Sequence, residues 1–236
     1  MPWPTFGTSI SPMRIEVSVV PVRASPADML WDVLSDEERR RAERYRFEED
    51  RRRSVVARGM LRVLLGGRLG RDPRRLEFVE GAQGKPALRG RELEFNVSHS
   101  GDRVAIAIAA GGSPVGIDIE VEQPRMTDLV VLARRYFSPG EAREVERAAE
   151  VDADAAMRLF FTIWTAKEAV IKAVGGGLSI ELASFSVLPV QTRLGAVENL
   201  GGDPKLDGWH VAALPSEEGY RTAVCALGAE WEIVRV

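Results

Sequence analysis

The stretch Phe161-Thr-Ile-Trp-Thr-Ala-Lys-Glu-Ala-Val-Ile-Lys172 is the most informative part of this chain. Its spacing predicts a helix with Trp164, Glu168 and Lys172 in one row at i, i+4 and i+8. A carboxylate and an ammonium group one turn apart can contact a cation and a phosphate together. An ordinary surface pair would be worth only about 0.2–0.5 kcal/mol, but the neighbours of this pair are mostly apolar. We interpret Trp164 as a core residue and the pair of Glu168 and Lys172 as functional.

A second stretch, Val115-Gly-Ile-Asp-Ile-Glu-Val121, has the alternation of a strand. Asp118 and Glu120 share one face of it, because side chains at i and i+2 point the same way. Two neighbouring carboxylates repel unless a positive charge lies between them. For an isolated pair of this kind, two solvated acids are the commoner explanation. Together with Glu168, however, the pair suggests a three-carboxylate cation site, and oxygen ligands favour Mg²⁺, or Mn²⁺, over zinc.

Two predicted turns carry further polar groups. Asn96-Val-Ser-His-Ser-Gly-Asp102 follows a strand and can present hydroxyls, an imidazole and backbone N–H groups to a phosphate. A Ser/His hydrolase is the competing interpretation, but adjacent Ser98 and His99 point different ways on an extended chain, and no nucleophile elbow occurs. Gly84-Lys85-Pro86 lacks the spacing of a Walker A loop and is more typical of a tight turn that aims Lys85 at an anion.

Composition is that of an ordinary soluble globular protein, with 45% hydrophobic and 28% charged residues. The sequence has no apolar run long enough to span a membrane and no signal-peptide pattern at its start. Cys225 is the single cysteine, so an internal disulfide and a cysteine-based zinc site are excluded. We therefore expect a cytoplasmic protein without membrane contact.

Charge is distributed unevenly. Residues 1–110 have a net charge of +4 and residues 111–236 of −7, within a total of −3. A basic half beside a carboxylate-bearing half suits an anionic ligand next to a metal, although solvated surface charge explains most of the arginines. The arginines between residues 39 and 58 form a basic patch, but interleaved acids argue against nucleic-acid binding.

The hydropathy pattern predicts an α+β chain. Strands are expected near residues 14–21, 76–79, 93–97, 104–110, 115–121, 184–188, 209–213, 222–227 and 230–234, and helices over 35–69 with a break near Glu49, 128–135, 139–149 and 153–174. The order strand, helix, strands occurs twice, and Gly101-Asp-Arg-Val-Ala is echoed by Gly219-Tyr-Arg-Thr-Ala. We therefore expect two similar lobes, each a small, mainly antiparallel sheet packed with helices. An irregular leader would cover residues 1–13, the N-terminal lobe 14–112 and the C-terminal lobe 113–236.

Four motifs, taken in order, resemble a known family. They are Gly84-Lys85-Pro86, Asn96-Val-Ser-His-Ser100, Gly116-Ile-Asp-Ile-Glu120 and Trp164-x-x-Lys-Glu-Ala-x-x-Lys172. Their order and separations are similar to those of the 4′-phosphopantetheinyl transferases, in the larger two-lobed type that serves carrier domains of peptide and polyketide synthases. The resemblance covers residues 14–230. It implies a pseudo-dimeric monomer that binds coenzyme A between its lobes and transfers phosphopantetheine to a serine of a carrier protein, releasing 3′,5′-ADP.

The resemblance also implies roles for individual residues. Mg²⁺ would be held by Asp118, Glu120 and Glu168, and its charge would assist phosphoryl transfer. Glu168 would be the general base, directly or through a water, and Lys172 would stabilise charge on the leaving 3′,5′-ADP. Coenzyme A would be held through the remaining motif residues: Lys85 at the adenosine end, Ser98 and His99 at phosphate, and Arg41 and Arg53 at the 3′-phosphate. The family often has a lysine near Glu38, where this chain has an acid.

A carrier protein is expected to dock around residues 122–140. Met126, Leu129, Val130, Tyr136 and Phe137 would offer an apolar patch to a carrier helix, or would simply belong to the core. The alternative to an enzyme is a non-catalytic module that binds coenzyme A or a nucleotide in a retained pocket. A phosphohydrolase that uses the same metal is a further alternative.

Overall fold

The computed structural model describes residues 12–81, 84–123, 128–188 and 194–236. The leader expected at residues 1–13 therefore lies, up to residue 11, outside the described residues. The first half contains β1 (Met13–Pro21), α1 (Ala27–Asp32), α2 (Asp36–Glu43), α3 (Glu48–Leu69), β2 (Phe78–Glu80), β3 (Pro86–Leu88), β4 (Leu93–Ser100) and β5 (Arg103–Ala110). The second half contains β6 (Val115–Val121), α4 (Leu129–Tyr136), α5 (Pro139–Val151), α6 (Ala153–Val174), β7 (Phe185–Ser186), β8 (Gly195–Ala196), β9 (Glu198–Asn199), β10 (Trp209–Leu214), β11 (Tyr220–Leu227) and β12 (Trp231–Arg235).

Local sequence signals explain where the long helices begin and end. Ser35 caps α2 in a reciprocal capping box, because its hydroxyl accepts from the Glu38 N–H while the Glu38 carboxylate accepts from the Ser35 N–H. The expected break near Glu49 is the short connection that separates α2 from α3. Both α3 and α6 stop at a glycine in the left-handed conformation, Gly70 with φ 61° and Gly175 with φ 74°. No helix among the described residues has the length and apolar character needed to cross a bilayer.

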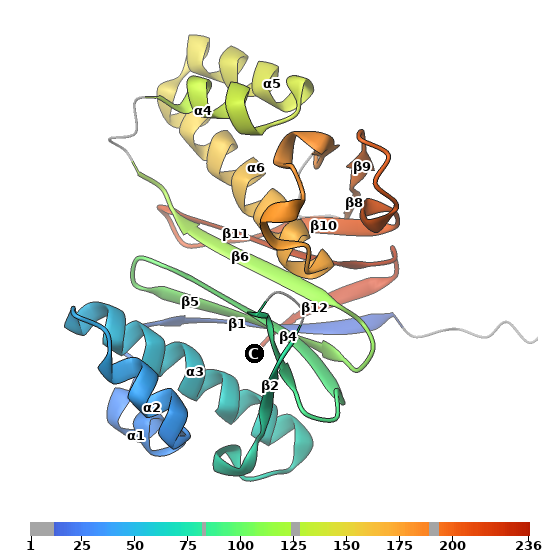
Figure 1. Ribbon diagram of the computed structural model, residues 1–236. Helices are drawn as coiled ribbons and strands as arrows, with labels where there is room; N and C mark the ends of the chain where they lie inside the picture. Colours follow the sequence, from blue (N-terminus) through green and yellow to red (C-terminus); the bar gives the residue numbers. More distant parts are fainter. Residues whose placement is uncertain (1–11, 82–83, 124–127, 189–193) are drawn as a thin grey trace, which may run out of the picture.

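Two four-stranded sheets form the framework. The first has the order β12-β1-β5-β4 and the second β6-β11-β10-β8, and only the pairing of β1 with β12 is parallel. The last strand was expected in the second lobe, but β12 pairs with β1 and completes the sheet of the first. This pairing covers an edge of β1 that would otherwise expose unpaired backbone groups. The C-terminus accordingly lies beside the first lobe (Figure 1).

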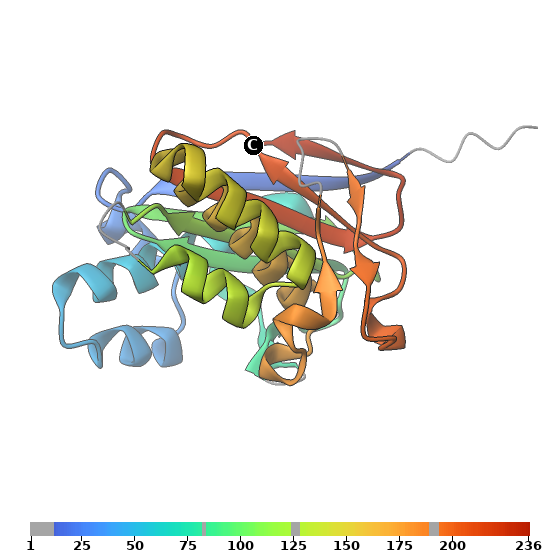
Figure 2. The same cartoon turned by 90° about the horizontal axis from the view of Figure 1, so that it is seen from above.

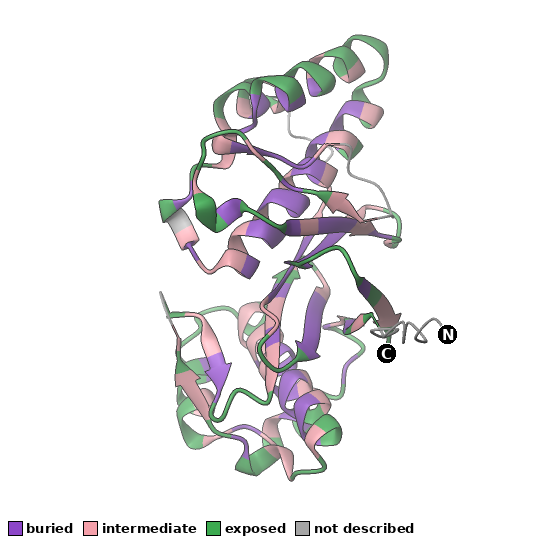
Figure 3. Cartoon of the chain, turned by 90° about the vertical axis from the view of Figure 1, so that its right-hand side faces the viewer, coloured by how far each residue is buried: buried purple, intermediate pink, exposed green. Residues whose placement is uncertain are grey.

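The two sheets lie face to face between two layers of helices (Figure 1). Apolar side chains of β1, β5, β6, β10 and β11 fill the space between the sheets. A second cluster packs α3 against the outer face of the first sheet, and a third packs α6 against the outer face of the second. Figure 2 shows α4, α5 and α6 covering that second sheet. Buried positions follow the two facing sheets and the inner sides of the helices, as Figure 3 shows. The chain is thus an α+β pseudo-dimer of two lobes, as expected.

The sequence echo marks corresponding hairpins but not corresponding side chains. Gly101 and Gly219, with φ of 53° and 78°, precede β5 and β11. The matched alanines point in opposite directions: Ala105 faces the other sheet, whereas Ala223 faces α6. Because side chains alternate along a strand, the two segments differ in register by an odd number of residues. The repeat is therefore one of architecture, and the matching letters do not identify equivalent positions.

Some small elements escaped the sequence patterns. The helix α1 and the two-residue strands β8 and β9 were not expected. Neither was β3, which begins at Pro86, the last residue of the expected turn, and pairs with β2. Segments this short carry too few residues for a hydrophobic period to be recognised. Their pairing partners decide their conformation.

Candidate active site

The helix α6 lies unusually close to β6, and a glycine makes this possible. A Cβ atom on Gly116 would lie 2.1 Å from the carbonyl oxygen of Ala169 and 2.5 Å from the N atom of Ala173. Only glycine can occupy that position without moving the helix. Small residues on the inner face of α6 complete the contact. This close approach brings Glu168 and Lys172 of α6 to the polar face of β6.

The faces of β6 separate as the sequence predicted. Ile117 and Ile119 pack between the two sheets, while Asp118 and Glu120 point toward the side that carries α6. Asp118 is 2% exposed, and Glu120 is half-buried. A buried carboxylate needs compensating partners, because burial without them disfavours the charged form.

Lys172, Asp118 and Ser98 form the centre of the site. The Nζ of Lys172 lies 2.6 Å from Oδ1 of Asp118 and donates to Oγ of Ser98 at 2.9 Å. The Ser98 hydroxyl donates to the same Oδ1 at 2.7 Å. The other carboxylate oxygen of Asp118, Oδ2, is buried and has no hydrogen-bond partner. This contact joins a strand of the first lobe, a strand of the second and α6 in one cluster.

The remaining two carboxylates lie beside this cluster. Oε2 of Glu120 accepts a hydrogen bond from the Ser100 hydroxyl at 2.7 Å. Burial raises the pKa of Glu120, and the neighbouring charges of Asp118 and Glu168 raise it further. Burial and the charge of Asp118 likewise raise the pKa of Glu168, while Lys172 opposes the change. The three acids therefore interact electrostatically, although β6 and this part of α6 are about 50 residues apart in the sequence.

The pKa of Asp118 is raised by burial, against the opposing effect of Lys172 and the Ser98 hydroxyl. Raised carboxyl pKa values mark a place where negative charge is under-compensated. The buried Oδ2 of Asp118 is the clearest sign, since a native protein rarely leaves such an atom unpaired. A cation would satisfy that oxygen and lower the mutual repulsion of the three acids.

The donor set fits a hard divalent cation, since its members are all carboxylate oxygens. In the arrangement described, however, the Lys172 ammonium is the cation next to Asp118. No group of three or more His, Cys, Asp or Glu side chains within the described ranges is gathered closely enough to hold a metal. A metal bound by these three acids would therefore require the side chains of the site to rearrange, and Lys172 and Glu168 are half-buried at the cavity.

A cavity of about 710 Å³ opens at this cluster. Its wall is formed by both lobes and by the segment after α6, and it includes Lys85, Asn96, Arg135, Tyr136, Glu168, Ile171, Lys172, Ile180, Glu181 and Leu182. The volume is that of a site for a sizeable small molecule. Asp118 and Ser98 are buried and contact Lys172, which lines the cavity. Cationic, hydroxyl and carboxylate groups together suit an enzyme that handles an anionic substrate.

Lys85 has a different setting from the one expected. Its Nζ donates to the carbonyl oxygens of Lys172 at 2.7 Å and Val115 at 3.1 Å. It therefore ties the last turn of α6 and the start of β6 to the turn before β3. Burial lowers the pKa of Lys85. It borders the cavity, so its role toward a ligand stays a prediction alongside this structural one.

His99 and Arg53 lie near each other at the end of β4. The Nε of Arg53 donates to the Gly101 carbonyl at 3.2 Å, and its guanidinium pairs with Asp50 at 2.7 Å. His99 is exposed at this edge. Protein atoms crowded around its ring lower the pKa of His99, and the charge of Arg53 lowers it further. The imidazole of His99 and the guanidinium of Arg53 thus lie close to each other near the end of β4, and the lowered pKa favours the neutral imidazole.

Arg41 is exposed on α2, and no contact joins it to this edge. Arg41 lies close enough to Arg58 for its positive charge to lower the pKa of Arg58. Glu38 in turn pairs with Arg58 at 2.8 Å and with Arg62 at 2.6 Å. An acid at this position therefore serves the interior of the first lobe. The expected contact of Arg41 with a phosphate stays a prediction.

The expected docking patch is divided between surface and core. Phe137 is 2% exposed and belongs to the core, and Leu129 packs partly against it. Tyr136 borders the cavity and packs edge-on against Trp164, while Met126 lies outside the described residues. Trp164 is itself stacked on Phe160, as expected of a core residue.

Two site residues were not expected from the sequence. Ser100 supports Glu120, and Asn96 accepts a hydrogen bond from the Ile117 N–H at 2.9 Å, which joins the lobes. The motif around His99 contained both, but only their partners on β6 reveal what they do. Sequence reasoning could have found them from the strand alternation, which places Asn96, Ser98 and Ser100 on one face of β4.

Comparisons with known proteins agree with the geometry. The 4′-phosphopantetheinyl transferase superfamily matches residues 114–225, and the N-terminal part of 4′-phosphopantetheinyl transferases matches residues 23–111. The 4′-phosphopantetheinyl transferase HetI of Nostoc sp. is 34% identical over 218 residues, 88% of this chain and 85% of that protein. A 4′-phosphopantetheinyl transferase of Bacillus subtilis is 30% identical over 207 residues, 87% of this chain and 88% of that protein. A Synechocystis sp. relative is 39% identical over 150 residues, 62% of this chain and 59% of that protein.

The chain therefore belongs to the 4′-phosphopantetheinyl transferase superfamily. Matches over both lobes assign it to the larger, two-lobed type, and it is a transferase enzyme.

Proposed function

We propose that this protein transfers the 4′-phosphopantetheine group of coenzyme A to a serine hydroxyl of a carrier protein and releases 3′,5′-ADP. The observation that carries the proposal is the cluster of Lys172, Asp118 and Ser98, of which Lys172 lines a cavity between the lobes together with Glu168. This arrangement can hold a pyrophosphate between cations and place a carboxylate beside it. Membership of the family supplies the substrates.

In this proposal the serine oxygen of the carrier attacks the phosphorus next to the pantetheine arm. The new P–O bond forms as the bond to the 3′,5′-ADP oxygen breaks, and the serine proton passes to Glu168, directly or through a water. A raised pKa suits Glu168 to this task, because a stronger base accepts the proton more readily near neutral pH. Lys172 donates to the phosphate oxygen that gains charge.

Ser98 and His99 would contact phosphate, and Arg53 would reach the 3′-phosphate from α3. The Ser98 hydroxyl already contacts Lys172 at 2.9 Å, so one phosphate oxygen could accept from both groups. Arg41 would help only if its long side chain turned toward Arg53. Lys85 would meet the adenosine end while it keeps its two carbonyl contacts.

Mg²⁺, or Mn²⁺ in its place, would be held by Asp118, Glu120 and Glu168. When bound, it would supply positive charge that stabilises the negative charge developing on the phosphates. The unpartnered Oδ2 of Asp118 and the raised pKa values of Asp118, Glu120 and Glu168 support this assignment. We also propose that the protein acts as a monomer in the cytoplasm and contacts neither membrane nor nucleic acid.

The decisive experiment is intact mass spectrometry of apo carrier domains. Carriers from several pathways are incubated with the protein, coenzyme A and Mg²⁺, and each is expected to gain the mass of phosphopantetheine. Omitting Mg²⁺, or replacing it with Mn²⁺, tests the metal separately. If no carrier gains mass while calorimetry shows that coenzyme A binds, the protein is a binding module. Release of 3′,5′-ADP without any carrier would instead indicate a hydrolase.

A further inference from the structure

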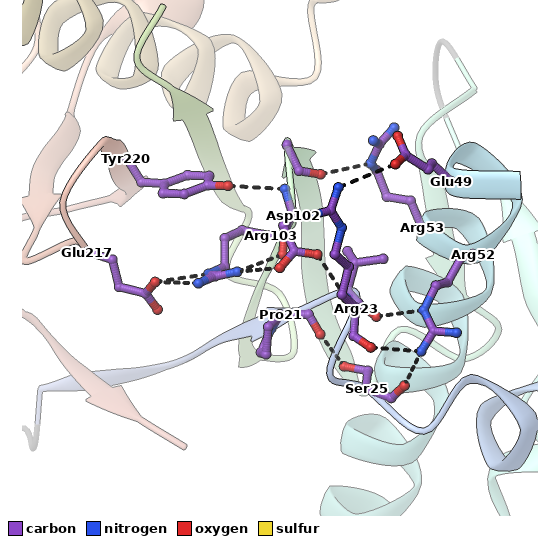
Figure 4. A network of polar contacts seen from close by, with 12 residues as sticks. Pro21, Arg23, Ser25, Glu49, Arg52, Arg53, Asp102, Arg103, Glu217 and Tyr220 are labelled. Carbon is purple, nitrogen blue, oxygen red and sulfur yellow. Dashed lines mark hydrogen bonds and ion pairs between the residues drawn. The ribbon is translucent and has the colours of Figure 1, made fainter. Parts of the chain in front are cut away.

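The turn Gly101–Asp102 directly follows the Ser98–Ser100 segment and joins β4 to β5. Figure 4 shows the polar contacts that converge on this turn from α3, from the end of β1 and from the second lobe. The turn itself makes no contact with the cavity. The turn can therefore support residues of the site without taking part in the reaction itself.

The first lobe holds the turn from two sides. Arg53 of α3 donates to the Gly101 carbonyl at 3.2 Å. The Val22 N–H donates to the Asp102 carbonyl at 2.9 Å, and the Arg23 N–H donates to the Asp102 carboxylate at 2.8 Å. These contacts use the acceptors of the turn and leave its Asp102 N–H to be satisfied from elsewhere.

The second lobe supplies that remaining contact. The Asp102 N–H donates to the hydroxyl oxygen of Tyr220 at 3.1 Å, across 118 residues of sequence. The Arg103 guanidinium lies over the Tyr220 ring at 5.4 Å and pairs with Glu217 at 2.5 Å and with Asp102 at 2.9 Å. The Tyr220 ring is thereby held in place, and its hydroxyl becomes a fixed point for the turn (Figure 4).

Gly101 shows how closely the hydroxyl approaches. Its φ is 53°, in the left-handed region that glycine adopts most readily. A Cβ atom at this position would lie 2.7 Å from the Tyr220 hydroxyl oxygen, inside van der Waals contact. The glycine is therefore required both by the backbone conformation and by the tyrosine of the other lobe.

We propose that Tyr220 is a positioning residue for the coenzyme A phosphates. Its hydroxyl fixes the Gly101–Asp102 turn, and the turn fixes His99, two residues earlier, and Arg53, which is bonded to the Gly101 carbonyl. Tyr220 thereby connects the second lobe to the two side chains, His99 and Arg53, that would meet a phosphate in the proposed function. The inference rests on the proposed function, and it names a group that touches neither substrate nor reacting atoms.

The test is Tyr220→Phe, which keeps the ring under Arg103 and removes only the hydroxyl. We expect KM for coenzyme A and the dissociation constant of 3′,5′-ADP to rise roughly two- to twelvefold, the range for one net hydrogen bond, with kcat within about twofold of wild type. Tyr45→Phe is the matched control, because Tyr45 is 43% exposed and makes none of these contacts; it should change neither constant.

A Tyr220→Phe variant with wild-type KM and wild-type affinity for 3′,5′-ADP would overturn the proposal, as would a loss of kcat with KM unchanged. A purely structural tyrosine would lower the unfolding midpoint and leave the KM-to-kcat split untouched. The binding measurement needs no turnover. If the wild-type protein bound 3′,5′-ADP but modified no carrier, the proposed function would be wrong. The positioning role of Tyr220 would still be tested, by comparing the affinities of wild type and Tyr220→Phe for 3′,5′-ADP.

A double-mutant cycle gives an independent check. Gly101→Ala should weaken 3′,5′-ADP binding in the wild-type background, through the contact with the Tyr220 hydroxyl and the left-handed φ. In the Tyr220→Phe background only the backbone strain remains, so the loss should be smaller. Equal losses in both backgrounds would show that the hydroxyl and the turn are not coupled, and would contradict the proposal.

Discussion

Two lysine–carboxylate pairs, whose lysines lie on the same helix, can be compared directly. Lys167 and Lys172 are five residues apart on α6, and each lies within hydrogen-bond distance of a carboxylate, Glu141 at 2.7 Å and Asp118 at 2.6 Å. In both pairs the carboxylate is almost completely buried. The pairs differ in how far the remaining hydrogen-bonding capacity of their atoms is satisfied.

The pair of Lys167 and Glu141 is complete. The Lys167 ammonium also donates to the carbonyls of Leu182 at 2.8 Å and Phe185 at 2.6 Å. Glu141 accepts from the N–H groups of Ser138 at 2.9 Å and Val187 at 2.8 Å. The pair therefore fastens α5 and α6 to the segment after α6, part of which forms the cavity wall.

The pair of Lys172 and Asp118 is incomplete. Oδ2 of Asp118 has no partner, and the Lys172 side chain is 28% exposed at the cavity. A buried polar group left unsatisfied costs stability, so it persists where a ligand completes it. The comparison teaches that burial and charge alone do not mark a functional site. The pair with an unsatisfied atom borders the cavity through Lys172, and the satisfied pair five residues away supports the scaffold.

The largest expected effect is on the reaction rate, at the site that contains the incomplete pair of Lys172 and Asp118. Glu168→Gln should reduce the rate of carrier modification about 100- to 10,000-fold, the range for loss of a general base. The fold should survive, because burial already disfavours the charged form of Glu168. Rate is measured by intact mass of the carrier, and the urea midpoint serves as the control for folding. Near-wild-type turnover would remove Glu168 from the mechanism.

For the complete pair of Lys167 and Glu141, the expected effect is on the free energy of unfolding. Glu141→Gln should lower the free energy of unfolding by about 3–5 kcal/mol, because it leaves the buried Lys167 charge without a counter-charge. Urea unfolding with the slope held common measures the change.

Glu144→Gln is the matched control for that experiment. Glu144 lies on the same helix and pairs with Arg147 at 2.6 Å, but both side chains are exposed, so no measurable change is expected. If the two variants were equally stable, the buried pair would not be the scaffold contact that we describe.

Lys85 combines one feature of Lys167 with one feature of Lys172. Its ammonium joins two carbonyl oxygens, as Lys167 does, yet it borders the cavity, as Lys172 does. Lys85→Met should lower the free energy of unfolding by about 1.5–3 kcal/mol, the range for hydrogen bonds to a charged group, and should also weaken 3′,5′-ADP binding.

The exposed Lys205 provides the control for Lys85. Lys205→Met should leave both unfolding and nucleotide binding unchanged. If Lys85→Met altered stability but not 3′,5′-ADP affinity, Lys85 would belong with Lys167 as a scaffold residue, and the coenzyme A contact expected from the family would be wrong for this chain.

Periodicity predicted the elements that carry the site, and it could do so for physical reasons. The strand over 115–121 and the helix over 153–174 occur with the bounds expected, because both have long apolar faces that must be buried. The same periods placed Asp118 and Glu120 on one face and Glu168 and Lys172 on one row. The convergence of those two segments required the family resemblance or a structure.

What periodicity could not predict was the identity of long-range partners. Lys167 was recognisable as one of four scarce lysines, but nothing near it in sequence names Glu141, 26 residues earlier, as its partner. The pairing of β12 with β1 and the contact of Tyr220 with Asp102 join segments more than a hundred residues apart. Such contacts depend on how the two lobes assemble, and local propensity has no access to that.

The smallest expected effect concerns His99 and pH. Protein atoms packed around the ring and the charge of Arg53 hold the pKa of His99 below its ordinary value of 6.5, whereas a bound phosphate would favour the imidazolium and raise it. The complex would then bind more protons than the free protein, so affinity for 3′,5′-ADP should increase as the pH falls through the interval between the two pKa values. Above that interval the imidazole is neutral in both states and the dependence disappears. The gain in affinity should not exceed about tenfold, the factor for one pKa unit.

Calorimetry between pH 5 and 8, comparing wild type with His99→Gln, separates this effect from the titration of the ligand phosphate. That titration is common to both proteins. Parallel pH profiles for the two proteins would show that His99 does not meet the phosphate.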